Sequence, residues 1–471
     1  MSTVILGGGI IGLSTAYYLS LAARASSPTR TIHIVDSSPA LLASASGFAG
    51  GFLAADWFSP SVAALGALSF RLHRELAETH DGPRRWGYAG SHTYNLSVDD
   101  GAAATRKGRR GDWLRDGTSR VEEASTSVVA GSQEKGGGDD AGGGRRGEDE
   151  TLNPDGSPAV WTPQPGGTLE TISGPESCAQ IEPRELCEFL LDECQKRGVQ
   201  VHLSTRATGI LTDDDDDDDD DDGALRGLVL ACTNPDGNTE TRDLECRDVL
   251  ISAGAWTPRV FETLFPKSTL QIPIEPLAGH SLVVKSPRYK RPFVDIAKRK
   301  VGGGSDNWLC YSIYSTASVH WSFAPEAFAR LARNGDPEIW VGGLNDSALP
   351  LPELASDVKA LIDPESIRSL RKTTVQLTGR VAEEGEEGND DDLETVREGL
   401  CFRPVSQRGT PLLGKIPEQY LGLQPSGSGG VWIASGHGPW GISLSLGTGL
   451  VMSELISGET PSADIKALLI A

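Results

Sequence analysis

The chain has 471 residues, enough for two or three domains with a large core, and 38% of them are hydrophobic. Its formal net charge of −22 at pH 7 argues against nucleic acid or an anionic membrane surface as a partner. Ten of the negative charges fall in one run, residues 213–222, so the rest of the chain has about the charge of an ordinary acidic enzyme.

Cysteine usage and apolar runs limit the cellular setting. The seven cysteines are odd in number and include no Cys-x-x-Cys pair, which argues against a disulfide framework or a zinc site and favours the reducing cytosol. No stretch of about 18 apolar residues predicts a membrane span. The N-terminal apolar stretch has no basic region before it, so we expect no signal peptide. We therefore expect a cytoplasmic protein without a metal site.

The N-terminal segment predicts a strand, a helix and a second strand. The apolar run 3–7 predicts the first strand, residues 10–24 predict the helix, and residues 31–36 predict the second strand. This order, with a glycine-rich turn after the first strand, is typical of the βαβ unit that binds dinucleotides.

The turn in this unit has the spacing Gly7-x-Gly9-x-x-Gly12. Such glycines permit a tight turn, a close approach of the backbone to a pyrophosphate, and close packing of the helix on the strand. Asp36, at the end of the second strand, is expected to accept a hydrogen bond from the adenosine ribose. A glycine-rich turn without a ligand is the alternative, but the flanking strand, helix and acid favour a dinucleotide site.

Three segments differ from the rest in composition. Residues 101–158 are rich in glycine and charge and lack apolar periodicity, so we interpret them as a disordered insertion, with a recognition arm as the alternative. The aspartate run 213–222 lies between two predicted strands. It lacks the glycine turn and ligand spacing of a calcium loop, so we expect a solvated hairpin tip. Residues 383–394 predict another acidic loop.

Further elements follow from periodicity and end signals. Residues 65–79 have the spacing of an amphipathic helix, and residues 182–197 predict a helix with Pro183 near its start and Gly198 after its end. The other predicted elements are strands at 199–203, 206–211, 249–256, 273–284, 308–315, 318–323, 338–344 and 431–435, a β-rich stretch at 399–414, and helices at 357–361, 364–374 and 441–456.

In this order, the elements resemble the FAD-dependent oxidoreductase family that includes D-amino-acid oxidase, glycine oxidase and sarcosine oxidase. Four stretches carry the resemblance. They are GGGIIG with Asp36, ASGFAGG at 45–51, ISAGAW at 251–256, and the C-terminal pair GLCFRPVSQRGTPLLG and VWIASGHGPWGISLSLGTG. The resemblance covers nearly the whole chain apart from the insertions. The chain also looks like fungal oxidoreductases of this family that are linked to endosome-to-Golgi trafficking.

The resemblance implies an α/β fold with a Rossmann-like FAD-binding domain and an antiparallel, β-rich α+β substrate domain. We expect the two domains to alternate along the chain. The expected segments are FAD-binding at 1–55, substrate at 56–160, FAD-binding at 161–265, substrate at 266–398 and FAD-binding at 399–471.

The resemblance also implies FAD as the cofactor. The glycine-rich SGHGPWG at 435–441 supports this, because a nicotinamide enzyme of the doubly wound type would not need a third cofactor-like segment. In this family the helix after that segment points its positive end at the flavin N1/C2=O edge. The residues expected to bind the cofactor are Gly7, Gly9, Ile10, Ile11, Gly12, Asp36, Ser37, Ser46, Gly50, Gly51, Ala207, Gly254, Cys401, Gly436, Gly438, Gly441 and Ile442.

Arg403 and His437 are the expected catalytic residues. Arg403, in CFRP, matches the family's GLRP-type stretch, whose arginine pairs with a substrate carboxylate; a structural ion pair is the alternative. For His437 the alternative is a loop histidine satisfied by the backbone. The family often continues with Thr-x-Asp-Gly, whereas this chain has Arg408 in that stretch, which would favour a more acidic substrate or pair with a loop acid.

Cys401 lies two residues before Arg403, where sarcosine oxidase and the fructosyl-amine oxidases carry a cysteine linked to the flavin 8α-methyl group. A buried unreacted thiol is the alternative. Trp440, Tyr311 and Trp321 are candidates for the pocket wall, with core packing as the alternative.

The implied reaction is oxidation of the C–N bond of a small amine or amino acid, by hydride transfer from the carbon beside the nitrogen to flavin N5. An N-methyl or glycated amine is a rival substrate. A rival of another class is a flavin-binding scaffold or regulator of endosome-to-Golgi trafficking, with weak or no activity and peripheral association with late endosomes. The sequence predicts no oligomeric state.

Overall fold

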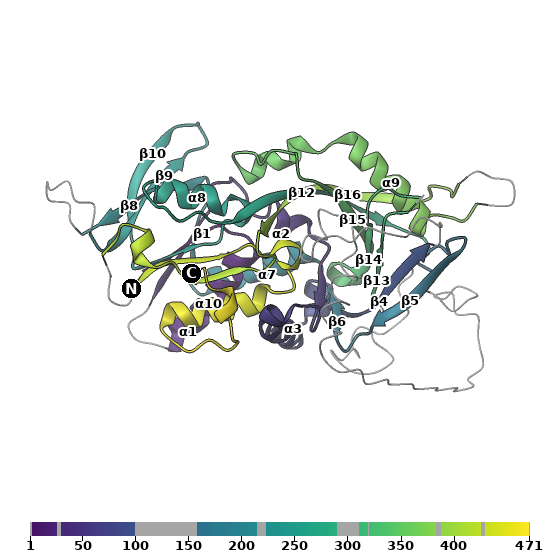
Figure 1. The fold of residues 1–471 in the computed structure, drawn as a ribbon, viewed down its shortest axis with the longest axis horizontal. Helices are drawn as coiled ribbons and strands as arrows, with labels where there is room; N and C mark the ends of the chain where they lie inside the picture. The colour runs from purple at the N-terminus through teal and green to yellow at the C-terminus, as the bar shows by residue number, and fades with distance from the viewer. Residues whose placement is uncertain are drawn as a thin grey trace.

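The computed structural model describes residues 2–25, 30–98, 158–213, 223–289, 310–318, 320–382, 388–424 and 429–470. The molecule is elongated, and Figure 1 shows both chain termini near one end and the strands of a large sheet at the other. The expected insertion up to residue 157, the aspartates 214–222 and residues 383–387 lie outside the described residues.

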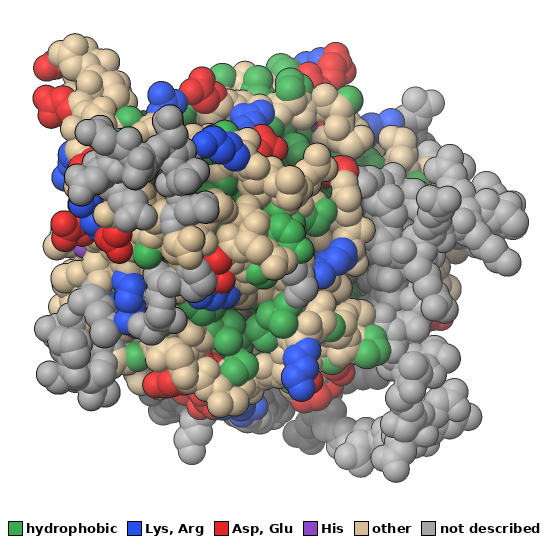
Figure 2. All heavy atoms as spheres, turned by 60° about the vertical axis from the view of Figure 1, so that its left-hand side comes forward, with side chains coloured by type: hydrophobic (Ala, Val, Ile, Leu, Met, Phe, Trp, Pro, Cys, Tyr) green, Lys and Arg blue, Asp and Glu red, His purple; other side chains and the backbone are tan. Residues whose placement is uncertain are grey.

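Acidic and basic side chains are interspersed on the described surface. Figure 2 shows this for the face at the end of the molecule that carries the termini. Exposed ion pairs such as Arg71–Glu75 (3.0 Å) are of a kind that contributes about 1 kcal/mol or less. In the described part of the chain, no helix has the length and apolar composition needed to cross a membrane.

A six-stranded, mainly parallel sheet forms the end that carries the termini. Its strands, in spatial order, are β17 (Leu412–Lys415), β18 (Gly430–Ser435), β11 (Asp248–Ile251), β1 (Ser2–Leu6), β2 (Thr31–Val35) and β7 (Gln200–His202). Neighbours from β18 to β7 run parallel, and β17 runs antiparallel to β18. Parallel strands are usually covered on both faces, and β1, β11 and β18 are accordingly apolar and buried along nearly their whole length.

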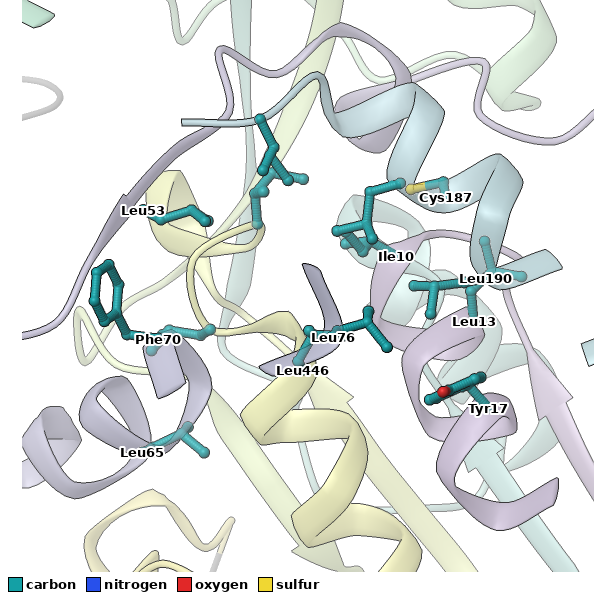
Figure 3. Close-up of a cluster of buried hydrophobic side chains, with 14 of the residues drawn as sticks. Ile10, Leu13, Tyr17, Leu53, Leu65, Phe70, Leu76, Cys187, Leu190 and Leu446 are labelled. Atoms are coloured by element: carbon teal, nitrogen blue, oxygen red, sulfur yellow. The ribbon is translucent and has the colours of Figure 1, made fainter. Parts of the chain in front are cut away.

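Four helices meet in the core beside this sheet. They are α1 (Ile10–Ala25), α3 (Pro60–Thr79), α7 (Pro183–Lys196) and α10 (Ser445–Ser457). Figure 3 shows side chains from all four in one cluster, among them Leu13 of α1, Leu76 of α3, Leu190 of α7 and Leu446 of α10. The start of α7 is as predicted, because the Glu182 carboxylate accepts the Glu185 N–H at 2.9 Å as an N-cap.

A nine-stranded mixed sheet forms the other end. Its strands, in spatial order, are β16 (Glu394–Ser406), β12 (Ile274–Lys285), β15 (Pro337–Asp346), β14 (Glu326–Leu331), β13 (Cys310–Ser315), β4 (Ala89–Val98), β6 (Cys178–Gln180) and β3 (Phe52–Ala54), with β5 (Gly167–Ser173) beside β4. Neighbours are antiparallel except for the parallel pair β13 and β4. Helix α9 (Pro364–Thr378) packs against β12 and β15. The α/β architecture expected from the resemblance, with one parallel-rich and one largely antiparallel sheet, is therefore present.

A three-stranded antiparallel sheet completes the fold, with β8 (Thr205–Thr212), β9 (Leu225–Thr233) and β10 (Thr239–Glu245). Strands β8 and β9 pair on either side of the aspartate run, so the hairpin predicted there is confirmed up to the described residues. The short elements are α2 (Ala45–Phe48), α4 (Gly82–Arg85), α8 (Thr257–Leu264) and the 3-10 helices Gly254–Trp256, Arg333–Gly335, Ala355–Leu361, Glu418–Tyr420, Gly438–Trp440 and Lys466–Leu468.

Two predicted strands are wrong in extent or place. The strand predicted over 249–256 ends at Ile251, and a 3-10 helix follows because Gly254 has a φ of +55°, which a strand does not allow. Residues 318 and 320–323 form no strand, and the strand β14 lies farther along instead. The period-2 signal was weak in β14 because all its residues are buried and Phe328 shares a face with the charged Glu326 and Arg330.

Two predicted helices start at other residues. The sequence predicts the last helix over 441–456, whereas α10 begins at Ser445 and a 3-10 turn precedes it. The helix predicted over 65–79 begins earlier, because Pro60 occupies its first turn, where proline has the backbone geometry of a helix start.

The acidic loop predicted over 383–394 is confirmed for residues 388–393, which lie in no helix or strand. The Arg371 guanidinium donates to the Asp391 carboxylate, and the Arg288 guanidinium donates to the Asp392 carboxylate at 2.7 Å. These hydrogen bonds lower the pKa of both carboxyl groups. The loop ends where β16 begins at Glu394, and these ion pairs hold it against neighbouring elements although its aspartates are exposed.

Candidate cofactor and substrate site

A cavity of about 620 Å³ lies between the two large sheets, within the range of roughly 300–1,000 Å³ that small-molecule and cofactor sites occupy. It runs from the ends of β1 and β2 past α2 to β16 and the turn before α10. Every residue predicted to bind the cofactor or the substrate lines this cavity, except Gly12 and Gly436.

The glycine-rich turn after β1 is built as the sequence predicts. Gly7 has a φ of +111°, and a Cβ there would lie 2.6 Å from the carbonyl oxygen of Ser252 in the neighbouring segment. A Cβ on Gly12 would lie 2.1 Å from the Gly7 carbonyl oxygen. Gly12 therefore allows α1 to pack closely on the turn and does not itself face the cavity.

Asp36 ends β2 at the same edge of the sheet. Its Oδ2 accepts the Gly8 N–H and its Oδ1 accepts the Ser38 N–H, both at 2.9 Å. Burial raises the pKa of this carboxyl, and the two backbone N–H groups oppose the shift. Because a carboxylate offers about four lone-pair sites, two remain for hydroxyl donors such as those of a ribose.

The small-residue segment at 45–51 connects the glycine turn to the nine-stranded sheet. The Ser46 hydroxyl of α2 accepts the Ile10 N–H of α1 at 2.9 Å, which links the two cavity-lining segments. At the far end, the backbone N–H groups of Gly50 and Gly51 have no acceptor among the described residues. A Cβ on Gly50 would lie 2.4 Å from the Phe328 ring, so only glycine fits at this contact.

The turn before α10 closes the opposite side, with His437, Gly438, Gly441 and Ile442 in the cavity wall. The helix that we expected to start at Gly441 begins after this turn, so the wall consists of a 3-10 turn instead of the first turn of a long helix. Gly436 has a φ of +81° and shapes the entry of the turn from outside the cavity wall.

Two buried histidines hold this turn. The His437 ring is paired with the Thr448 hydroxyl through Nε2 at 3.1 Å, and its Nδ1 has no partner within the described chain. Burial lowers the pKa of His437 to about 3. His73 of α3 lies 3.0 Å from the Ile442 carbonyl oxygen through Nε2, and burial lowers its pKa to about 4. His73 was missed because nothing in the local pattern of α3 distinguishes it from a core residue.

Arg403 lies at the β16 side of the cavity. Its Nη1 donates to the Asn345 side-chain oxygen, and within the described residues it makes no ion pair with a carboxylate. A Cβ on Gly279 of β12 would lie 2.4 Å from this guanidinium, so glycine leaves the space that the arginine occupies. Cys401, on the same strand, lines the cavity, and burial raises the pKa of its thiol.

The aromatic wall differs from the one expected. Phe328 of β14 and Trp340 of β15 stack with their centroids 5.1 Å apart, and both line the cavity. Tyr311 and Trp321 belong to the core on the other face of the sheet, and the Trp440 ring packs edge-on against Phe58 with their centroids 4.9 Å apart. The alternation of side chains along β14 and β15 would have assigned Phe328 and Trp340 to the cavity face, had both strands been predicted with the right register.

Arg408 does not reach the cavity. Its guanidinium donates to the carbonyl oxygens of Leu469 at 2.9 Å and Leu468 at 3.3 Å. The two roles weighed for this arginine, selection of an acidic substrate and pairing with a loop acid, are both replaced by a contact with the C-terminal segment.

The cavity residues fit an elongated dinucleotide carrying a flat ring system. One end offers a glycine turn and a carboxylate, and the other end offers aromatic rings and an arginine. The middle offers two backbone donors that no acceptor in the described part of the chain satisfies.

Comparisons with known proteins indicate the family and its cofactor. The model of the FAD dependent oxidoreductase (DAO) family matches residues 2–455. A Schizosaccharomyces pombe protein is 25% identical over 467 residues, covering 99% of this chain and 96% of that protein. A Saccharomyces cerevisiae protein is 25% identical over 542 residues, covering 99% and 93%. Both yeast proteins are provisionally named as oxidoreductases. The crystal structure of glycine oxidase from Geobacillus kaustophilus matches with a TM-score of 0.62 and 18% identity, covering 100% of this chain and 98% of that one.

The fold and the site thus define a flavoprotein of the oxidoreductase class, and the chain belongs to the FAD-dependent oxidoreductase (DAO) family. FAD is the cofactor that this family membership indicates, and the cavity residues fit it.

Proposed function

We propose that this protein oxidises the C–N bond of a small amine or amino acid that carries a carboxylate. The observation that supports the proposal is Arg403, a cavity-lining guanidinium held by an amide instead of a carboxylate. An arginine without an ionic partner in a cofactor cavity is suited to a bidentate pair with a substrate carboxylate.

The chain's own residues would orient the substrate and exclude water. Arg403 would bind the carboxylate, while Phe328 and Trp340 would form an apolar wall beside the reacting carbon. Bound FAD supplies the hydride acceptor and carries the redox chemistry. His437 is neutral near pH 7 because burial lowers its pKa to about 3, so we propose that it shapes the turn and is not a proton donor.

The test is anaerobic reduction of the FAD-loaded protein by a panel of D- and L-amino acids, N-methyl amino acids, glycated amines and plain amines. Bleaching of the flavin absorbance by carboxylate-bearing amines, and not by amines without a carboxylate, is the expected result. A flavoprotein that no amine in the panel reduces would contradict the proposal.

Arg403→Met is expected to lower kcat/KM for carboxylate substrates by about 100-fold or more, because a charged partner of the carboxylate is lost. Steady-state kinetics and the Kd of FAD measure the effect, and FAD binding should stay unchanged. Arg408→Met is the matched control, since this arginine follows the same strand but its guanidinium donates to the C-terminal segment and does not line the cavity. Equal losses in both variants would contradict the assigned role of Arg403.

We separately propose that the Cys401 sulfur forms a thioether with the flavin 8α-methyl group. Its place in the cavity wall supports the linkage, while burial raises the pKa of the thiol and disfavours the thiolate. Acid precipitation decides between the two states: a yellow pellet means a covalent flavin, and a yellow supernatant means a dissociable one. Cys401→Ser should turn a yellow pellet colourless.

The second candidate is a flavin-binding scaffold that acts in endosome-to-Golgi trafficking, in the cytoplasm or at late endosomes. It rests on the resemblance of the sequence to fungal oxidoreductases linked to this trafficking, whereas the two yeast relatives are named only as oxidoreductases. Arg403→Ala separates the two candidates, because an enzyme loses turnover whereas a scaffold keeps its role in cargo sorting.

A further inference from the structure

Arg330 of β14 is a fully buried arginine that the proposed reaction does not use. Its Nη1 donates to the Gly50 carbonyl oxygen at 2.7 Å and to the Ala49 carbonyl oxygen at 3.2 Å. Both Ala49 and Gly50 line the cofactor cavity. A buried cation of the nine-stranded sheet therefore holds the backbone of the small-residue segment at 45–51 by hydrogen bonds.

The carbonyls on either side of this contact are held as well. The Trp340 indole N–H donates to the Phe48 carbonyl oxygen at 2.9 Å, and the Ile181 N–H donates to the Gly51 carbonyl oxygen at 3.0 Å. Four consecutive carbonyls, from Phe48 to Gly51, thus accept hydrogen bonds from groups outside the segment. The orientation of these peptide planes is set by their neighbours and not by local secondary structure.

Because the peptide bond is planar and trans, these carbonyl contacts also fix the direction of the Gly50 and Gly51 N–H groups. The N–H of a residue points opposite to the carbonyl of the residue before it. When Arg330 holds the carbonyls of Ala49 and Gly50, the N–H groups of Gly50 and Gly51 must point away from Arg330. Neither N–H has an acceptor among the described residues, and both residues line the cavity.

We propose that Arg330 is a positioning residue that aims the Gly50 and Gly51 N–H groups at an electronegative edge of the bound FAD. This inference rests on the flavin site of the proposed function, but not on the identity of the substrate. Two preorganised backbone donors favour a cofactor that gains electron density on reduction.

An ion cluster keeps Arg330 in place. Its Nη2 donates to Glu182 Oε1 at 3.1 Å, and Glu338 lies 3.9 Å away. Arg397 donates to the same Glu182 oxygen at 3.3 Å. Glu182 is also the N-cap of α7, so the cluster ties the nine-stranded sheet, the cofactor segment and a core helix together.

Arg330→Lys is the variant to test, because Arg330→Met would leave buried carboxylates without their cation and impair folding. Lysine keeps the charge but lacks the planar fork that spans two carbonyls and a carboxylate. We expect the Kd of FAD to rise by about tenfold, since charge-assisted hydrogen bonds that fix the donors are lost. The midpoint potential of the bound flavin should become more negative.

Arg397→Met is the matched control, because it removes a second cation from Glu182 without touching the carbonyls of Ala49 and Gly50. It should lower the thermal stability and leave the Kd of FAD within about twofold of wild type. The positioning role of Arg330 would be contradicted if Arg330→Lys and wild type had the same Kd of FAD and the same midpoint potential. It would also be contradicted if Arg330→Lys and Arg397→Met raised the Kd equally. A wild-type protein that takes up no FAD would instead refute the flavin site itself.

Discussion

At the scale of single residues, burial sets the charge of the side chains around the cavity. His437 pairs with Thr448 and is buried, and His73 contacts the Ile442 carbonyl. Burial lowers the pKa of His437 to about 3 and of His73 to about 4. Both rings are therefore neutral near pH 7, and the turn between the cavity and α10 carries no charge from them.

This neutrality predicts an acid-sensitive fold. As the pH falls below about 6.5, an unfolded histidine binds a proton and folded His437 does not, so stability is lost by up to about 1.4 kcal/mol per pH unit until the folded pKa is reached. His437→Asn should make the fall of the unfolding free energy between pH 6.5 and 4 shallower, as measured by urea titration. Thr448→Val keeps the buried ring, so it should lower stability by a similar amount at each pH. Unchanged steepness in His437→Asn would contradict the buried neutral state.

At the scale of elements, residues 351–354 form a strap across one end of the cavity, between β15 and the following 3-10 helix. The Arg259 guanidinium of α8 donates to the Leu351 carbonyl at 2.8 Å and to the Pro352 carbonyl at 2.7 Å. The Trp256 indole N–H donates to the Pro352 carbonyl at 2.9 Å. An exposed pair, Arg206 and Glu353, adds a contact at 3.3 Å. Glu353 and Arg259 line the cavity, so the strap covers the expected adenosine end.

The two arginines are expected to differ in their effect. Arg259→Met removes two charge-assisted hydrogen bonds to the strap and should raise the FAD dissociation rate several-fold. Arg206→Met removes an exposed ion pair of a kind worth about 1 kcal/mol or less, and should change the rate by less than about twofold. Stopped-flow displacement of FAD measures both rates. A larger effect from Arg206→Met would mean that the strap is held at its exposed edge.

At the scale of the whole molecule, the cavity joins the two large sheets. Asp36 and the glycine turn belong to the parallel sheet, whereas Arg403, Phe328 and Trp340 belong to the mixed one. A ligand that contacts both sheets binds only when both are folded and correctly placed. Ligand binding to the native state alone raises stability by mass action.

FAD is therefore expected to stabilise the protein as one unit. At a free FAD concentration about 100 times its Kd, the gain is about 2.7 kcal/mol, seen as a higher Tm and a single transition by calorimetry. Asp36→Ala should reduce the shift in Tm, because this change removes the carboxylate that orders Gly8 and Ser38 and that we expect to bind the ribose. A second transition that FAD does not move would show that the sheets unfold separately.

The sequence by itself determined the βαβ unit and the cofactor class, and nearly all of the residues that it predicted for the site do line the cavity. These features depend on short-range rules: Gly7 and Gly12 are required by backbone contacts within one turn, and Asp36 follows its strand directly. Arg403 and Cys401 came from a contiguous motif, which also fixes their place on one strand.

Only the tertiary structure decided the far side of the site. Two residues of the cavity wall, Phe328 and Trp340, lie on strands whose sequences look like ordinary core. The same holds for His73 and Arg330, which contact backbone carbonyls of the segments that form the wall. The first residue of α10 and the contacts of the Arg408 guanidinium likewise depend on residues far away in the sequence. The physical reason is that these roles arise from contacts between segments hundreds of residues apart, which leave no period or spacing in the chain for local rules to detect.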